Sequence, residues 1–168
     1  LNMGDISGMV RTFDATTYFA ESAQWQVEKF IHVAAAYPPF NVPETAERDE
    51  LAQATGNPVA IVGSIGPAGS VADTIEYLDQ QAAASPNRFR GVRAPAYDAG
   101  VPEPEVLRVL QERSFVLDVM THPDKLQEAA SALADFPDLT IVVEHTGWPR
   151  TNSAEEYELW QSGMAAFA

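Results

Sequence analysis

The sequence predicts an α/β protein built on a parallel sheet, and two observations carry that prediction. Five short segments rich in branched and aromatic residues recur about 25 to 31 residues apart, with helical stretches between them. Their apolar runs are nearly continuous, which is typical of strands buried on both faces of a parallel sheet. The alternation of strand and helix predicts successive βα units in a single domain, residues 1–168.

Each predicted element has its own local signal. The strands are "EKFIHVAA" (28–35), "PVAIVGSI" (58–65), "RFRGVRA" (88–94), "SFVLDVM" (114–120) and "LTIVVEH" (139–145). The helices are residues 43–55, which start with Pro43 and stop before Gly56, and residues 102–113 and 123–136, each with one apolar stripe. Ser70 with Asp73, and Ser153 with Glu156, have the spacing of capping boxes and predict two further helix starts.

Composition excludes several classes of protein. The chain has 24 acidic and 10 basic residues, a net charge of −14, which argues against nucleic acid or an anionic membrane as partner. No apolar run approaches the roughly 18 residues of a membrane helix. The chain has no cysteine, so disulfides and thiolate zinc sites are excluded. The first residues lack the features of a signal peptide, and we expect a cytoplasmic protein.

The loops divide into two chemically different sets. Loops that lead from a helix into a strand are plain, whereas loops that leave a strand are longer and carry reactive groups. The carboxyl ends of parallel strands share one edge, and that edge hosts the functional site of α/β proteins. The groups at or just beyond these ends are His122, His145, Glu144, Arg93, Tyr97, Trp148 and Arg150. This sorting predicts a site for a small-molecule substrate.

The order and spacing of several segments together carry a resemblance to a known family. Residues 27–168 contain, in order, "FIHVAAAYPPFNVPET", "VAIVGSIG", "FRGVRAP", a Leu-Asp strand followed by "PDKLQEAA", "VVEHTGWP" and "LWQSGMAAFA". Together they resemble the amidohydrolase-related family of TIM-barrel hydrolases and decarboxylases. The likeness is strongest to the branch of sugar lactonases and 2-pyrone-4,6-dicarboxylate lactonase. The resemblance implies a (β/α)8 barrel and hydrolysis of a lactone or amide, with metal-dependent decarboxylation as the alternative.

The resemblance also implies roles for particular residues. His145 matches the histidine that closes the sixth strand, which is a metal ligand or a substrate contact, and His122 matches a second metal ligand after the fifth strand. The implied cofactor is a divalent metal, zinc first, or none if the protein is lactonase-like. Arg93 is similar to arginines that bind a substrate carboxylate. Tyr97, Trp148 and Arg150 are expected to line the substrate site.

Two departures from the family pattern concern completeness. The His-x-His pair of the first strand and the aspartate of the eighth have no match, and a full barrel takes about 250 residues. We therefore expect strands two to six of eight in a chain that starts at Leu1, without a full catalytic set and inactive in this form. Such a segment leaves two unpaired strand edges, which predict association into a homo-oligomer.

Other interpretations stay open. A self-contained, doubly wound domain of five strands that binds without catalysing would show the same periodicity. His145 and His122 could serve only as hydrogen-bonded turn residues, and Trp148 and Tyr97 could pack on the barrel rim. His32 and Asp118, each inside a strand, are expected to be structural. Glu144 should point away from His145, toward the helix layer, because neighbours on a strand face opposite sides.

Overall fold

The computed structural model describes residues 7–36, 38–66, 70–95 and 101–168. Tyr97, one of the predicted substrate contacts, lies outside these residues. The chain divides into two compact units, Leu1–Phe30 and Ile31–Ala168. The first unit holds α1 (Ala15–Glu21) between two short 3-10 turns, η1 (Ser7–Met9) and η2 (Ala23–Trp25). The Asp14 carboxylate caps α1 by accepting a hydrogen bond of 2.8 Å from the Thr17 amide.

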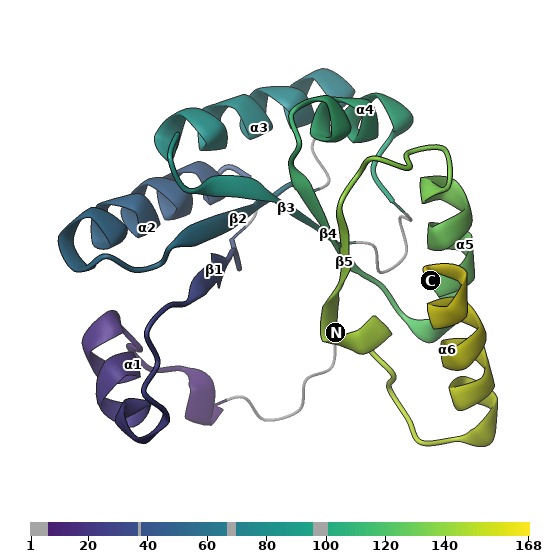
Figure 1. Cartoon of the computed structure of the whole chain (residues 1–168), viewed down its shortest axis with the longest axis horizontal. Helices are drawn as coiled ribbons and strands as arrows, with labels where there is room; N and C mark the ends of the chain where they lie inside the picture. The colour runs from purple at the N-terminus through teal and green to yellow at the C-terminus, as the bar shows by residue number, and fades with distance from the viewer. Residues whose placement is uncertain (1–6, 37, 67–69, 96–100) are drawn as a thin grey trace. The chain divides into compact units, whose positions relative to one another are not determined.

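The second unit contains a five-stranded sheet in which every neighbouring pair is parallel. The strands are β1 (Ile31–Val33), β2 (Ala60–Ser64), β3 (Phe89–Pro95), β4 (Val116–Met120) and β5 (Ile141–Val143). They lie in the order β1-β2-β3-β4-β5, the order of the sequence. A doubly wound sheet reverses its strand order at a switch point, and this sheet has no such reversal. The sequential order, together with the curl of the sheet, is that of part of a TIM barrel (Figure 1).

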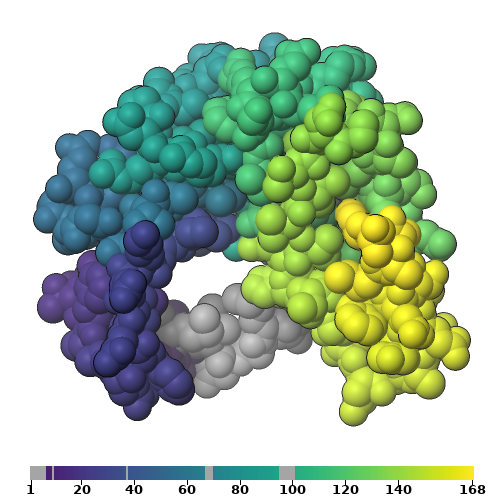
Figure 2. Space-filling model, in the orientation of Figure 1, coloured from purple at the N-terminus to yellow at the C-terminus, as the bar shows by residue number. Residues whose placement is uncertain are grey.

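Helices follow the strands as predicted. They are α2 (Asn41–Thr55), α3 (Val71–Ala84), α4 (Pro104–Glu112), α5 (Pro123–Leu133) and α6 (Ala154–Ala166). Both predicted capping boxes are confirmed at their serines: Ser70 Oγ accepts from the Asp73 amide and Ser153 Oγ from the Glu156 amide, each at 3.1 Å. α2 to α5 cover the convex side of the sheet, and α6 lies beside α5 (Figure 1). In the space-filling view this unit runs as an arc from α2 to α6 (Figure 2).

The main core lies between the sheet and its helices. Val92 and Leu117 are fully buried there, against Leu78, Leu107 and Leu110. Side chains alternate along a strand, so the neighbouring residues Arg93 and Asp118 face the opposite, concave side. Arg93 and Asp118 are also register partners across β3 and β4. The apolar strands thus have one helix-covered face and one face that carries charge.

A buried polar network fixes the carboxyl end of β2. The side-chain amides of Asn41 and Gln81 both donate to the Ser64 carbonyl at 2.9 Å, and Gln81 Oε1 accepts from the Ser64 amide at 3.0 Å. All three residues are buried, with at most 1% of their surface exposed. Because buried polar groups are costly unless they are bonded, this network holds the strand end to α2 and α3.

A second polar contact fixes the residues after β1. The Glu44 carboxylate accepts from the amides of Ala35 (3.2 Å) and Ala36 (3.0 Å). It also lies 3.3 Å from His32 Nε2. Burial alone would raise the pKa of Glu44, but the hydrogen bonds from His32 and the two amides outweigh it and lower the pKa. His32 is half-buried, with its Nε2 beside the Glu44 carboxylate.

No helix within the described residues is both long enough and apolar enough to cross a membrane.

Candidate active site

Arg93 occupies the centre of the concave face. Its Nη1 donates to the Ala34 carbonyl at 2.8 Å, and its Nη2 donates to Glu144 Oε1 at 2.5 Å. Ala34 follows the edge strand β1, and Glu144 follows the edge strand β5. Adjacent strands lie about 4.8 Å apart, so the two edges of a flat five-stranded sheet would be separated by roughly 19 Å. One guanidinium can contact both only because the sheet is curled.

Asp118 and Glu144 form a pair of carboxyl groups beside this guanidinium. Asp118 is only 4% exposed. Burial first, and then the negative charge of Glu144, raise the pKa of Asp118 to about 6, although Arg93 acts in the opposite direction. A hydrogen bond between the two carboxyls adds to the rise, and such a bond requires a proton on one of them. Below about pH 6, where Asp118 is protonated, the remaining charges of the cluster are those of the Arg93–Glu144 ion pair.

Three atoms of this cluster have no hydrogen-bond partner within the described residues. They are Arg93 Nε, Asp118 Oδ1 and Glu144 Oε2, and all three are buried. Buried polar atoms are normally bonded. The concave face therefore retains one donor and two acceptors that a bound molecule, or a further part of the protein, can satisfy.

His145 lies beyond the strand, where the sequence had placed it at the strand's end. β5 stops at Val143, and Glu144–Gly147 forms a 3-10 turn, η3. His145 (φ 47°), Thr146 (φ 53°) and Trp148 (φ 43°) all have left-handed backbone conformations, which a strand cannot contain. Each such residue costs on the order of 1–2 kcal/mol, so the surrounding structure has to hold the turn in place.

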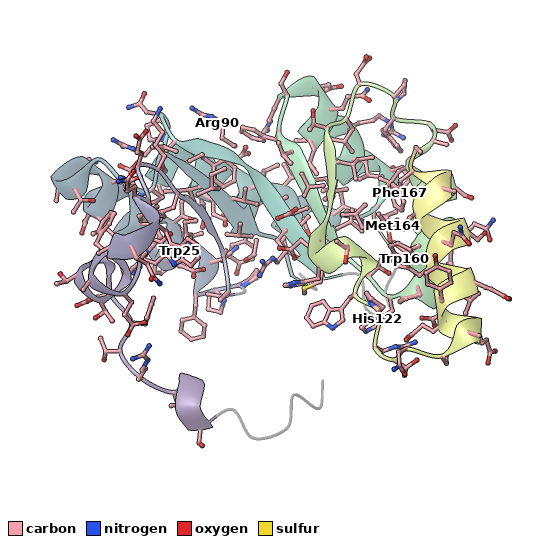
Figure 3. All side chains as sticks on the ribbon, turned by 60° about the horizontal axis from the view of Figure 1, so that its bottom comes forward. Trp25, Arg90, His122, Trp160, Met164 and Phe167 are labelled. Atoms are coloured by element: carbon pink, nitrogen blue, oxygen red, sulfur yellow. The ribbon has the colours of Figure 1, made fainter. Side chains whose placement is uncertain are left out.

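Two helices provide that support. Gly147 (φ 77°) is buried, and a Cβ built on it would lie 2.7 Å from a methyl group of Leu126 on α5. The same Cβ would lie 3.3 Å from the sulfur of Met164 on α6. The indole Nε1 of Trp160, also on α6, donates to the Thr146 carbonyl at 2.6 Å. In Figure 3, Trp160 and Met164 extend from α6 toward the end of β5.

Trp148 brings the two predicted histidines together. Its ring centroid lies 4.4 Å from that of His145 and 5.9 Å from that of His122, in edge-to-face geometry. His122 Nδ1 also lies 3.3 Å from the Trp148 carbonyl oxygen. His122 is the N-cap of α5, two residues after β4. His145 is exposed, whereas His122 and Trp148 are half-buried. The three side chains form one cluster at the carboxyl ends of β4 and β5.

The described residues do not fit a metal site. Among them, no three side chains of His, Asp or Glu converge as metal ligands would. His122 and His145 each contact Trp148, and the carboxylates of Asp118 and Glu144 engage Arg93 and each other. We therefore derive no chemical step through a metal.

Arg150 holds two helix starts together. Its Nη2 lies 3.0 Å from Asp124 in the first turn of α5, and its Nε lies 3.4 Å from Glu156 in the first turn of α6. The Glu156 carboxylate also accepts from the amides of Arg150 and Thr151. A hydrogen bond from the Thr151 side chain first, and then these amide bonds, outweigh burial and lower the pKa of Glu156 to about 2. A substrate contact by Arg150 would have to compete with two carboxylates.

One expectation about an acidic residue is wrong. Glu144 points to the concave face, where it contacts Arg93, and not to the helix layer. The expectation treated His145 as part of the strand, but His145 lies in the turn after the strand has ended. Asp118, expected to be structural, is buried in the same cluster. Its position amid "SFVLDVM" was the available signal that it has a charged neighbour, since a lone carboxylate in an apolar strand is costly. Trp160 is not among the residues predicted from the sequence, because nothing in its helical context marks its contact with the turn.

The fold and the site together define a class of protein. Five consecutive βα units with sequential parallel strands, and polar side chains gathered beyond the strands' carboxyl ends, are the architecture of βα-barrel enzymes. The family model described as "Amidohydrolase" matches residues 30–168. The chain belongs to the amidohydrolase family.

The chain is 25% identical over 185 aligned positions to the uncharacterized protein y4mH of Sinorhizobium fredii. That alignment covers 98% of this chain and 59% of the relative, so the chain spans a little more than half of the relative's length. No solved structure matches the chain.

Proposed function

We propose that the chain forms part of a hydrolase that acts on a small carboxylate-bearing lactone or amide, at the carboxyl ends of its strands. Membership of the amidohydrolase family supports hydrolytic activity in general. The observation that carries the finer proposal is the placement of Arg93. Its guanidinium lies on the concave face with Nε buried and unbonded among the described residues, and it contacts Glu144, the residue before His145.

Arg93 would bind the anionic group of the substrate. A carboxylate that approaches it meets the free Nε, and it can replace Glu144 on Nη2 to form the two-pronged contact that arginine favours. As the pH falls toward 6, protonation of Asp118 lowers the negative charge beside the guanidinium. A protein of net charge −14 could in this way accept an anion at one place on its surface.

His145 would contact the carbonyl that reacts. It is exposed, it lies two residues after β5, and the Trp148 ring against it restricts its orientation. A protonated ring nitrogen could donate a hydrogen bond to the carbonyl oxygen, where negative charge develops during hydrolysis. His122, on the other side of Trp148, is the second histidine within reach of this place. In this proposal, a carboxylate on a later strand of the whole protein activates the water.

The test is hydrolysis of a panel of carboxylate-bearing lactones and amides by the full-length protein. We expect His145→Asn and Arg93→Met to lower kcat/KM at least 100-fold. Arg90→Met is the matched control, since Arg90 is exposed on the same strand and its bonds within the described residues are to the Phe89 and Asn87 carbonyls. Thermal unfolding of each variant separates lost activity from lost structure.

Two outcomes would contradict the proposal. Wild-type rates in both folded variants would remove His145 and Arg93 from the site. Release of carbon dioxide without ring opening would instead identify a decarboxylase of the same family.

A further inference from the structure

The turn that carries His145 has an unusual support. Its backbone is left-handed at three non-glycine residues, His145, Thr146 and Trp148. Within the described residues, hydrogen bonds to its backbone carbonyls come from inside the turn, from Trp160 and from His122. Of these, the Trp160 bond is the one that comes from α6, a helix that follows the turn in sequence. The position of His145 therefore depends on a helix that itself carries none of the predicted site residues.

We propose that Trp160 is a positioning residue for His145, which it directs through the Thr146 carbonyl. The proposal rests on the function proposed above only for its kinetic consequence. The indole Nε1 donates to Thr146 O at 2.6 Å, and that carbonyl belongs to the Thr146–Gly147 peptide, one residue beyond His145. The bond thus fixes the plane of the Thr146–Gly147 peptide. The Trp148 amide and the Thr146 hydroxyl both donate to the His145 carbonyl, so a fixed turn also restrains the backbone from which the His145 side chain leaves.

The packing around the turn makes this contact directional. On one side, Gly147 lies against Leu126 and Met164 so closely that it leaves no room for a Cβ. On the other side, Trp148 packs edge-to-face against both His145 and His122. If the Thr146 carbonyl rotates away from Trp160, Gly147 blocks movement toward the helices. The turn can then relax only on the solvent side, where His145 is exposed.

The same geometry explains why the residue is a tryptophan. Tryptophan carries a ring N–H that donates and never accepts, so it matches a carbonyl and no other backbone group. Its ring also packs against Tyr157, one turn earlier on α6, with centroids 5.7 Å apart. This contact holds the indole on the side of α6 that faces the turn. A phenylalanine at this position would keep an aromatic ring and lose the donor.

The test compares two ways of removing the donor with one control. Trp160→Phe removes the N–H together with part of the ring. Replacing the indole at position 160 with its sulfur isostere, benzothiophene, removes only the N–H and protects the test against misfolding. Tyr157→Phe is the control, because it removes a hydroxyl from the same face of α6 and leaves the Thr146 bond intact.

The first readout needs no activity. We expect the His145 ring resonances in nitrogen-15 NMR spectra to shift in both donor-free variants and to stay in place in Tyr157→Phe. We also expect the Trp148 amide, bonded to the His145 carbonyl at 3.0 Å, to exchange with deuterium about 10-fold faster, as loss of one hydrogen bond predicts. Unchanged His145 resonances and an unchanged exchange rate in the isostere variant would overturn the proposal.

The second readout is kinetic. Misplacement of a group that acts on the reacting carbonyl lowers kcat while leaving substrate binding by Arg93 in place. We expect kcat to fall about 10-fold, with KM within 2-fold of the wild-type value. An equal loss in the Tyr157→Phe control would overturn the assignment to Trp160. Altered His145 resonances in a protein that hydrolyses none of the substrates would support the positioning role and contradict the proposed function alone.

Discussion

Arg93 and Glu144 lie 2.5 Å apart, from Nη2 to Oε1, although they are 51 residues apart in the sequence. The contact joins the middle strand of the sheet to the residue that follows its last strand. Since Arg93 also reaches Ala34 beyond the first strand, a single side chain spans the inner side of the curled sheet. Predictions about stability and about pH dependence follow from this cluster and from the turn beside it.

Removal of the Arg93 guanidinium should destabilise the protein. Arg93→Met would leave Asp118 and Glu144 buried without a cation, and breaking a buried ion pair on one side costs about 3 kcal/mol. Urea unfolding should show a loss of this size, against less than about 1 kcal/mol for Arg90→Met on the exposed side. The double variant Arg93→Met/Glu144→Gln should recover part of the loss. A double variant less stable than Arg93→Met would contradict the pairing.

Asp118 should make the wild-type protein less stable as the pH rises. Its pKa is about 6 in the folded state against 3.8 as its usual value. Below pH 3.8 the carboxyl is protonated in both states, so its contribution to stability is fully present there. Between these values the unfolded chain loses the proton first, which lowers the free energy of unfolding by up to roughly 1.4 kcal/mol per pH unit.

Asp118→Asn tests this directly, because the amide does not titrate and can still donate to Glu144. Relative to the wild type, the variant should gain about 2 kcal/mol or more of stability between pH 4 and pH 7. Asp135→Asn is the control for removal of a carboxyl from the surface. Parallel stability profiles for the wild type and Asp118→Asn would show that the Asp118 pKa is not raised.

Glu156 should have the opposite pH dependence. Hydrogen bonds from Thr151 and Arg150 lower the pKa of Glu156 to about 2 from 4.5. Its contribution to stability is therefore present above pH 4.5 and is lost as the pH falls toward 2. Glu156→Gln should be less stable than the wild type at pH 7, and the difference should shrink in acid. Glu155→Gln, at the exposed neighbouring position in the same helical turn, should show no such convergence.

Gly147 should tolerate alanine less well than Gly56 does. Both glycines have positive φ, 77° and 82°, but a Cβ on Gly147 would lie 2.7 Å from Leu126, whereas nothing lies within 4 Å of one on Gly56. Gly56→Ala should cost about 1 kcal/mol for its conformation alone, and Gly147→Ala should cost roughly 1–2 kcal/mol more. Thermal unfolding measures both. Equal losses would mean that Leu126 moves aside freely.

The sequence by itself determined the βα units, because their signals are local. The five apolar segments became the five strands, and the serines at positions 70 and 153 cap the helices predicted from them. Periodicity and capping depend on residues within one or two turns of each other, so they can be read along the chain. The family resemblance over residues 27–168 was confirmed in its coarse form by the family match over residues 30–168.

The tertiary structure decided which side chains meet. The alternation of side chains along the predicted strand does not show that the strand ends at Val143. His145 was therefore assigned to the strand, and Glu144 was expected on the opposite face from the one it occupies. The left-handed turn at His145 depends on Trp160, Leu126 and Met164, which come from helices before and after it in sequence. Arg93 contacts Ala34 and Glu144 because the sheet curls. Curl is a property of all five strands together and is not written in any one of them.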